Sequence, residues 1–437
     1  MKILSITAGA AGMYCGSCSR DNAMARELLS RGHDVTLVPV YTPTRTDEPN
    51  MSRPRVLFGG ISVYLQQYVP LFRNTPHFLD RLWDSPRVIE TFAGRMVSNN
   101  PKLLGDLTIS MLQGESGVLR KEFGKLLDWI RREPLPDIVN LPNSLLIAMA
   151  APLRAALDRP VCCTLQGEEL FIDGLTAPYR ERALELIRQQ ARHVDRFVAV
   201  SDYCAKYMAD YLRIPGDRIE VVPLGINLTG YERRAPVPQA IQDGEFRIGY
   251  FARIAPEKGL HFLAEAYTLF RKRTAQNARI RLEAAGYASR AHQTYLENVR
   301  RSLGKAGLAH EFSYRGVLDR EGKLAFLRSL DVLSVPATCD EPKGMFLLEA
   351  MACSVPVVEP RRGAFIEIVE KTGGGLLVDS GDAESLADGL YKLWSDRTTA
   401  AVLSERAFRG VRAHYSVEHS AARLLDVYNA AILQYKK

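Results

Sequence analysis

Short apolar runs rich in β-branched residues alternate with longer segments of helical periodicity along the whole chain. This alternation is typical of parallel sheets that carry helices on both faces, so we expect an α/β protein. Each half of the chain contains enough predicted strands for one complete sheet. The predicted strands are 2–6, 34–40, 137–140, 160–165, 196–200 and 218–222, followed by 246–251, 279–284, 311–315, 332–335, 355–359 and 375–378.

The two series of strands are separated by residues 232–245, which contain Pro236 and Pro238 and show no helical period. Such a stretch is typical of a linker. The sequence therefore predicts two Rossmann-like domains with doubly wound parallel sheets, one at 1–230 and one at 245–415. We expect ligands to bind in a cleft between them, at the carboxyl ends of the strands.

Two segments depart from the alternating pattern. Residues 56–133 interrupt the first domain with a helical insertion, which suggests a binding wall or lid. Residues 416–437 contain an amphipathic helix that we expect to pack back on the first domain. The insertion's predicted helices are near 63–72, 76–83, 87–98, 101–112 and 118–132, and the last helix's expected buried face is Ala421, Leu424, Leu425, Val427, Tyr428, Ile432 and Leu433.

The helix predicted at 118–132 is amphipathic and basic. Basic amphipathic helices can lie on anionic membranes, so one hypothesis is a peripheral membrane contact that would suit a lipid-linked substrate. The more common alternative is that the apolar face packs inside the protein. The basic residues are Arg120, Lys121, Lys125, Arg131 and Arg132.

Composition excludes several classes of protein. Hydrophobic residues make up 46% and charged residues 24% of the 437 positions, which excludes a disordered chain. The net charge of +7 is spread along the chain without a long run of like charges, so we expect no nucleic-acid partner. Seven cysteines are too few and odd in number for a disulfide scaffold, which favours a reducing compartment. With no long apolar span, we expect a cytoplasmic protein, at the inner face of the membrane if 118–132 binds lipid.

The most informative stretch runs from 331 to 359. A strand ends near Pro336, a polar loop carries Glu341, and Gly344 opens an almost wholly apolar helix whose exception is Glu349. A carboxylate on a buried helix needs hydrogen bonds, so Glu349 either meets a hidden cation or accepts hydrogen bonds from a ligand's hydroxyl groups. The free N–H groups expected at Met345, Phe346 and Leu347, together with the helix dipole, favour an anion site.

A second stretch, 246–260, places Arg253 and Lys258 in the loop after a predicted strand. Two cations at the carboxyl end of a strand are suited to a diphosphate, with the guanidinium binding as a fork and the ammonium as a point charge. The alternative, which we favour for this stretch taken alone, is a pair of solvated loop charges.

Together these motifs carry a resemblance. Arg253-x4-Lys258 and Glu341-x7-Glu349, with DVLSVPA before the second pair and EAMACSVPVV around its end, resemble the retaining glycosyltransferases of family 4, which have the GT-B fold. VAVSDY at 198–203 and VVPLGIN at 221–227 extend the resemblance over residues 196–378. The first 50 residues match more loosely, and 56–133 match nothing in the family pattern.

The resemblance implies a role for each matching residue. Arg253 and Lys258 would hold the diphosphate of a nucleotide-sugar donor, Glu349 would accept both ribose hydroxyls, and Glu341 would lie beside the donor sugar. Backbone N–H groups from Gly344 to Leu347 would face sugar and phosphate, and Val317 and Leu318 would lie against the nucleobase. The donor set that this implies is Gly12, Arg253, Lys258, Val317, Leu318, Glu341, Gly344, Met345, Phe346, Leu347 and Glu349.

One position departs from the family pattern. Members commonly carry a histidine after a strand of the first domain, in the place where this chain has Gln166. An amide can donate to a sugar hydroxyl but cannot accept a proton at neutral pH. We therefore expect Gln166 to orient the sugar; the alternative is a catalytically silent sugar-nucleotide-binding protein of the same fold.

The loop after the first strand contains Gly9 and Gly12, but no acidic residue ends the second strand at Val40, which disfavours NAD binding. Our preferred hypothesis is a glycine-rich loop that faces the cleft before a helix at 21–31. Arg20, Asp21 and Asn22 would then contact donor phosphate or acceptor.

The same loop contains Cys15-x-x-Cys18. This spacing also suggests a redox pair, although the rest of a thioredoxin-like domain is missing. As half of a zinc site it lacks a second C-x2-C motif, and Cys162 with Cys163 are expected to pack in a strand.

Taken together, the sequence predicts a metal-independent, cofactor-independent retaining hexosyltransferase of carbohydrate biosynthesis. It would move a hexose from a UDP- or GDP-type nucleotide sugar to a hydroxyl acceptor, which is a saccharide, a lipid-linked sugar or a small molecule. The catalytic residues would be Arg253, Lys258, Glu341 and Gln166, with the cations stabilising the departing diphosphate. Retention rests on the family resemblance alone.

Overall fold

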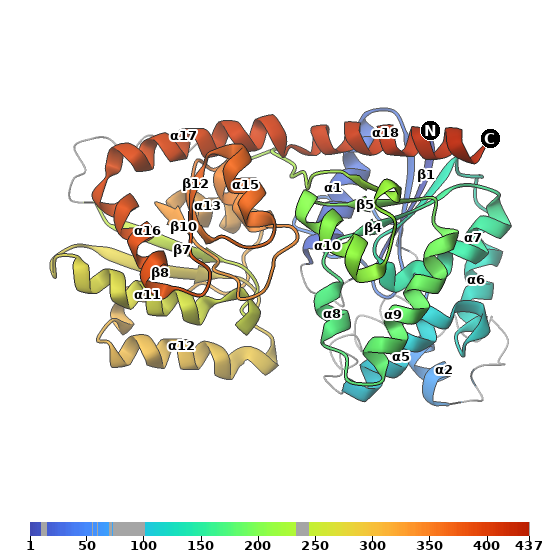
Figure 1. The fold of residues 1–437 in the computed structure, drawn as a ribbon, viewed down its shortest axis with the longest axis horizontal. Helices are drawn as coiled ribbons and strands as arrows, with labels where there is room; N and C mark the ends of the chain where they lie inside the picture. The colour runs from blue at the N-terminus through green and yellow to red at the C-terminus, as the bar shows by residue number, and fades with distance from the viewer. Residues whose placement is uncertain are drawn as a thin grey trace. The chain divides into compact units, whose positions relative to one another are not determined.

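A computed structural model describes residues 1–9, 15–54, 56–58, 60–69, 72, 101–232 and 244–436. The chain forms two compact units, Met1–Gly225 with Val417–Lys437, and Ile226–Ser416 (Figure 1). Gly12, the helices predicted at 76–83 and 87–98, and most of the predicted linker lie outside the described residues.

The first unit is built on a six-stranded parallel sheet of order β2-β1-β3-β4-β5-β6. The strand order reverses beside β1, as it does in doubly wound folds. Its strands are β1 (Lys2–Thr7), β2 (Asp34–Pro39), β3 (Ile138–Leu141), β4 (Val161–Leu165), β5 (Arg196–Ala199) and β6 (Ile219–Val221). Its helices are α1 (Gly16–Ser30), α2 (Gly60–Tyr68), α5 (Pro101–Gln113), α6 (Arg120–Ile130), α7 (Ala150–Leu157), α8 (Glu169–Asp173), α9 (Tyr179–Gln190), α10 (Asp202–Leu212) and α18 (Val417–Tyr435).

The second unit is built on another six-stranded parallel sheet, of order β12-β11-β10-β7-β8-β9. The order reverses between β7 and β10, so this unit has its own switch point. Its strands are β7 (Phe246–Phe251), β8 (Ile280–Ala285), β9 (Phe312–Tyr314), β10 (Val332–Leu333), β11 (Val357–Pro360) and β12 (Gly375–Val378). Its helices are α11 (Leu260–Arg273), α12 (Gln293–Lys305), α13 (Arg320–Ser329), α14 (Met345–Ala352), α15 (Ala364–Thr372), α16 (Ala383–Ser395) and α17 (Arg397–His414). The predicted α/β class with two doubly wound parallel sheets is confirmed.

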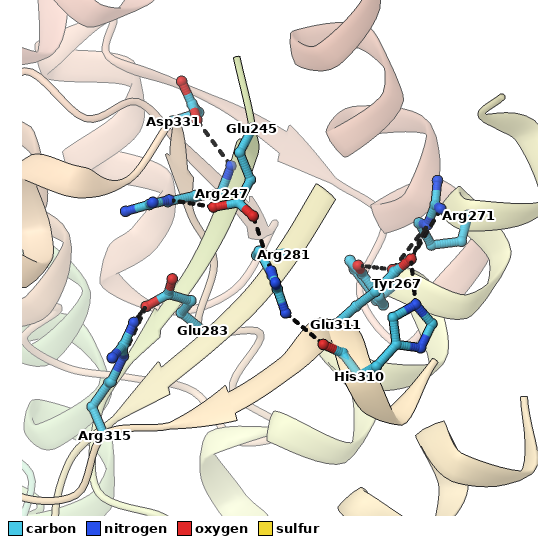
Figure 2. Close-up of polar contacts among 10 residues, drawn as sticks. All are labelled: Glu245, Arg247, Tyr267, Arg271, Arg281, Glu283, His310, Glu311, Arg315 and Asp331. Carbon is cyan, nitrogen blue, oxygen red and sulfur yellow. Dashed lines mark hydrogen bonds and ion pairs between the residues drawn. The ribbon is translucent and has the colours of Figure 1, made fainter. Parts of the chain in front are cut away.

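The amino-terminal edge of the second sheet is held by a polar network (Figure 2). The Glu245 carboxylate accepts hydrogen bonds from Arg247 Nε and Arg281 Nε, each at 2.9 Å. The Asp331 carboxylate accepts from the Arg247 backbone N–H, also at 2.9 Å. Because these contacts join the starts of β7, β8 and β10, they fix the strands at the edge opposite to their carboxyl ends.

Helix α1 corrects a predicted boundary. The helix predicted at 21–31 begins at Gly16, after Cys15 as an extended N-cap. Residues 16–19 are weak helix formers, but tertiary packing stabilises the helix from Gly16 onward. Cys18, Met24 and Leu28 are all buried on this helix. The region around Arg20, Asp21 and Asn22 is therefore buried helix and not an open loop.

Helix α6 corresponds to the helix predicted at 118–132. Its Phe123 and Leu126 belong to the core of the first unit, together with Leu141 and Leu153 from β3 and α7. The apolar face that a membrane contact would need is thus buried in the protein core, as the packing alternative predicts. Among the described residues, no helix has the length and apolar character required to cross a membrane.

Helix α18 packs on the first unit. Figure 1 shows this C-terminal helix beside α1 and β1. Leu424 and Tyr428 are buried against Ile3 of β1 and Leu28 of α1. Leu433, which was predicted to be buried, is 65% exposed, because the buried face near the end of the helix passes through Ala431 instead.

A buried carboxyl group lies near the carboxyl end of β11. Glu359 is completely buried; its Oε1 accepts a hydrogen bond from the Val335 N–H at 2.9 Å, and its Oε2 has no partner within the described residues. Burial raises the pKa of Glu359 well above its ordinary value; the Val335 N–H opposes this shift, and the negative charge of Glu341 adds to it. Glu359 was not predicted as a functional residue.

The Leu424→Ala variant should lower the free energy of unfolding by about 2–5 kcal/mol, because it leaves a cavity between α18 and the sheet. Leu433→Ala, on the exposed side of the same helix, should change it by no more than about 0.5 kcal/mol. Urea unfolding of both variants measures the difference. Equal effects would contradict the observed packing of α18.

The Glu359→Gln variant should become increasingly stable relative to the wild type as the pH rises from 5 to 8. A carboxyl group with a raised folded-state pKa keeps its proton in the folded protein while the unfolded chain releases it, so the wild type loses stability over this range. Glutamine has no proton to lose. Melting temperatures across the pH range test this, with Glu297→Gln, a change at an exposed side chain of the same unit, as the control. A difference between variant and wild type that does not change with pH would show that Glu359 ionises normally.

Candidate functional site

Two loops meet at the switch point of the second sheet. One follows β7 and leads into α11, and the other follows β10 and leads into α14. Because β7 and β10 are hydrogen-bonded neighbours, their carboxyl ends bring Arg253 and Lys258 of one loop near Glu341 and Gly344 of the other. This is the position at which doubly wound sheets bind ligands.

Lys258 and Glu341 form a buried ion pair between the two loops. The Lys258 ammonium donates a hydrogen bond to Glu341 Oε2, and the two side chains are only 14% and 6% exposed. Burial raises the pKa of Glu341, but the Lys258 and Lys343 charges and the Gly344 N–H outweigh it, so the net pKa is below its ordinary value. The carboxylate is therefore ionised, and it forms an ion pair with the Lys258 side chain.

Glycines make the close approach of these loops possible. Gly259 has a φ of +73°, and a Cβ placed there would lie 1.9 Å from the Pro336 carbonyl oxygen. Gly363 has a φ of +51°, and its Cβ would lie 2.5 Å from the Glu341 carbonyl oxygen. That carbonyl accepts a hydrogen bond from the Ala364 N–H at 2.8 Å, so backbone contacts fix the position of Glu341.

Helix α14 begins directly after Gly344, which adopts the left-handed conformation with a φ of +62°. The first N–H groups of a helix have no intrahelical acceptor, which leaves those of Met345 and Phe346 for other partners. The N–H of Leu347 donates to the Gly344 carbonyl at 3.0 Å. The prediction that Leu347 offers a free N–H group is therefore wrong, because the first turn of the helix is tight.

The buried Glu349 has two partners that were not predicted. Its Oε1 accepts a hydrogen bond from Tyr231 Oη at 2.8 Å and one from Lys323 Nζ at 2.6 Å. The hidden cation, one of the two alternatives for Glu349, is thus present and lies on α13. Both contacts are to Oε1, so the ion pair does not use Oε2. In the sequence Lys323 looks like an ordinary surface charge, and no local pattern pairs it with Glu349.

Arg253 is placed differently from Lys258. Its side chain is 53% exposed and pairs with Glu257 four residues later, at 2.8 Å. An exposed pair of this kind contributes little to stability. The Arg253 side chain can therefore leave Glu257 and contact a ligand at little cost in stability.

The residues predicted to face a nucleobase lie at the same edge of the sheet. Val317 and Leu318 follow β9, and Val317 is 49% exposed. The Gly316 carbonyl accepts a hydrogen bond from the Gly286 N–H at 2.8 Å, which ties this loop to the end of β8. Exposed apolar surface beside backbone polar groups suits a flat heteroaromatic ring.

Gln166 lies at the carboxyl end of β4 in the first unit. Its Nε2 donates to the Pro142 carbonyl at 2.7 Å, and its backbone N–H donates to Glu168 Oε2 at 2.8 Å. Its Oε1 is buried without a hydrogen-bond partner among the residues described. The amide is thus fixed in orientation. Its oxygen is left for a further contact, whereas its NH₂ group already donates one hydrogen bond.

Arg20, Asp21 and Asn22 are not placed as predicted. All three are buried on α1, and Asn22 is occupied by the fold: its Nδ2 donates to the Pro49 carbonyl at 3.0 Å and its Oδ1 accepts from the Met51 N–H at 2.7 Å. Helix α1 starts at Gly16, so these residues lie buried within the helix and not at its exposed start, where contact with a ligand was expected.

Two glycosyltransferase family models match the chain: "Glycosyltransferase Family 4" over residues 111–229 and "Glycosyl transferases group 1" over residues 232–409. A D-inositol 3-phosphate glycosyltransferase of Arthrobacter sp. (strain FB24) is 28% identical over 239 residues, which is 54% of each chain. A GDP-mannose-dependent alpha-(1-6)-phosphatidylinositol monomannoside mannosyltransferase of Mycobacterium tuberculosis is 26% identical over 256 residues, covering 56% of this chain and 64% of that protein. The chain thus spans little more than half the length of the curated relatives that it matches.

Solved structures share the fold over the full length. Anabaena Alr3699/HepE in complex with UDP has a TM-score of 0.68 at 18% identity, covering 98% of this chain and 100% of that one. The sucrose-phosphate synthase of Thermosynechococcus elongatus has a TM-score of 0.71 at 17% identity, covering 99% and 100%. The predicted GT-B fold and family are confirmed, and the chain belongs to the glycosyltransferases, with a family 4 region followed by a group 1 region.

Proposed function

We propose that this protein transfers a hexose from a nucleoside diphosphate sugar to a hydroxyl acceptor, with retention at the anomeric carbon. The observation that carries the proposal is the buried Lys258–Glu341 pair at the switch point of the second sheet, beside the start of α14. Relatives whose names include a GDP-mannose-dependent mannosyltransferase support a hexosyl donor.

The diphosphate would bind where the two loops meet. An ammonium group has three N–H donors, and one of them is used by Glu341, which leaves two for phosphate oxygens. The N–H groups of Met345 and Phe346, with the positive end of the α14 dipole, add donors that need no reorganisation. Arg253 would leave its exposed contact with Glu257 and bind a second phosphate oxygen as a fork.

The same groups would drive the reaction. Negative charge grows on the departing diphosphate as the sugar–oxygen bond breaks, and preorganised donors stabilise it. We propose that no protein nucleophile, metal ion or cofactor takes part, because Arg253, Lys258 and the helix amides supply the positive charge. The leaving phosphate oxygen would take the proton from the acceptor hydroxyl as that oxygen bonds to the anomeric carbon.

Glu349, Val317 and Leu318 would bind the nucleoside. Lys323 and Tyr231 hold Glu349 by Oε1, so Oε2 would accept hydrogen bonds from the ribose hydroxyls. The exposed Val317 would lie against the base. Glu341 would lie beside the sugar while keeping Lys258 in place.

Gln166 would contact the hexose through its buried, unpartnered Oε1, as an acceptor for a sugar hydroxyl. A neutral amide oxygen orients a hydroxyl but takes no proton from it at neutral pH. This residue also motivates the second candidate, a silent sugar-nucleotide-binding protein. Release of free sugar or product from the donor separates the two, because a silent binder retains the donor unchanged.

The acceptor belongs to the proposal only as a chemical class: a hydroxyl group on a saccharide, a lipid-linked sugar or a small molecule. We place the reaction in the cytoplasm, because the apolar face of α6 is buried and not available for a membrane contact. None of the seven cysteines forms a disulfide bond, which supports the proposal of a reducing compartment.

The donor can be identified by a thermal-shift panel of UDP, GDP and ADP sugars. A ligand that binds only the folded state stabilises it by about 2.7 kcal/mol at a concentration of about 100 Kd. We expect one base to raise the melting temperature well above the other two. A panel in which no nucleotide sugar shifts the melting temperature would contradict the proposed function.

Lys258→Ala should lower turnover by about 100- to 1000-fold, the effect of removing one charge-stabilising donor. It should also lower stability by about 3–5 kcal/mol, because Glu341 would be left as an unpaired buried charge. Lys258→Arg keeps the charge pair and should restore most of the stability but little of the turnover. Lys272→Ala, at an exposed cation of α11, is the control. Turnover that follows stability through all three variants would reduce Lys258 to a structural role.

Glu349→Gln should weaken binding of the preferred nucleoside diphosphate about 10- to 100-fold, since a hydrogen bond to a charged acceptor is lost. The sharper readout is selectivity for the ribose. Calorimetry should show that the wild type prefers the ribonucleotide over its 2′-deoxy form and that Glu349→Gln has lost this preference. If the preference survives in the variant, Glu349 serves only the ion pair with Lys323.

A further inference from the structure

The Cys15-x-x-Cys18 pair takes no part in the proposed glycosyl transfer, yet its geometry is specific. Cys15 is the N-cap of α1, with an extended backbone at φ −123° and ψ 125°, and Cys18 is the third residue of the helix. Side chains at the N-cap and at the third helical position face one another, as they do in a capping box. Cys15 is half-buried and Cys18 is buried, so one thiol is accessible and the other lies behind it.

The two thiols interact directly. A hydrogen bond between the Cys15 and Cys18 side chains, together with burial, raises the pKa of Cys18 far above its ordinary value. Cys18 therefore stays protonated unless a neighbouring base removes its proton. An accessible first thiol and a protonated, shielded second thiol form the usual arrangement of a dithiol that closes to a disulfide.

A base is present one helical turn further on. Asp21 is 4% exposed, its Oδ1 accepts a hydrogen bond from Arg20 Nη1 at 3.2 Å, and its Oδ2 has no hydrogen-bond partner in the described part of the chain. Burial raises the pKa of Asp21 to about 6, although Arg20 and Thr7 oppose the shift. The Asp21 charge acts on Cys18, and that of Cys15 acts on Asp21, so the three groups share one buried polar site.

We propose that Cys15 and Cys18 form a redox-active dithiol that low-molecular-weight disulfides oxidise to an intramolecular disulfide, with the Asp21 carboxylate as the base for Cys18. A pair of cysteines that served only for packing would not need a buried carboxylate beside it. A zinc site is not supported, because no group of three metal-ligating side chains occurs among the described residues.

The chemistry balances with the disulfide RSSR as the oxidant. The Cys15 thiolate attacks one sulfur of RSSR, a Cys15–SR bond forms, and RS⁻ leaves and takes up the proton that Cys15 released, giving RSH. Asp21 then removes the proton from Cys18, whose thiolate attacks Cys15 Sγ and expels the second RS⁻. Asp21 returns the proton to that leaving group. Two thiols are oxidised, one RSSR is reduced to two RSH, and no other reactant is needed.

Incubation of the full chain with oxidised glutathione tests the proposal. Mass spectrometry of the peptide that carries both cysteines should show an internal Cys15–Cys18 disulfide and no retained glutathione. Cys339 is a half-buried cysteine outside any such pair, so its mixed disulfide with glutathione should persist. In the Cys18→Ser variant, glutathione should remain on Cys15. Glutathione retained equally on Cys15 in the wild type and in Cys18→Ser would overturn the proposal, as would an unreacted pair.

Asp21→Asn tests the role of the base. The amide keeps the shape of the side chain but cannot accept the proton, so closure of the disulfide should slow by about 100-fold, at the lower end of general base effects. Formation of the mixed disulfide at Cys15 should change little, which distinguishes a base for Cys18 from general damage to the helix. Closure at the wild-type rate in a folded Asp21→Asn variant would remove Asp21 from the proposal. If that variant does not fold, the Cys18→Ser comparison still decides whether the pair is redox-active.

Discussion

The buried ion pair between Lys258 and Glu341 joins the two loops that carry the proposed donor site. Each loop follows one of two neighbouring parallel strands, β7 and β10. A buried charge on Lys258 or on Glu341 would be costly without the opposite charge of the other residue. The left-handed glycines at 259 and 363 let backbones approach within distances that a side chain would forbid. Both the backbone geometry and the ion pair therefore fix the site before a ligand binds. Stabilisation of a developing diphosphate charge requires such preorganised groups.

The polar groups of the second unit divide between the two edges of its sheet. At the amino-terminal edge, the Glu245 carboxylate accepts hydrogen bonds from both Arg247 and Arg281, so these residues hold the strands. At the carboxyl edge, Arg253 keeps only an exposed partner, and the first amides of α14 have no helical acceptor. Groups with spare hydrogen-bonding capacity are thus present at the edge where ligands bind in folds of this kind.

Much of this was predictable because strands and their following loops have local signals. The bounds of β7 and β12 were predicted to the residue. Lys258 and Glu341, predicted for one site, do contact one another across the two loops. The errors come from tertiary contacts. Packing of Cys18 and Met24 starts α1 early, which moves Asp21 from the predicted first residue of the helix to its buried second turn. Lys323 looks like a surface residue in the sequence, and only the fold brings it to Glu349. Roles that involve bound ligand, such as that of Gln166, stay predictions.

A crystal structure of the protein with its preferred nucleoside diphosphate tests the central claim most directly. The account predicts that both phosphorus atoms lie between Arg253 and the start of α14, with phosphate oxygens within hydrogen-bond distance of Lys258 Nζ and of the Met345 or Phe346 N–H group. A diphosphate bound elsewhere, with Lys258 still paired only to Glu341, would contradict it.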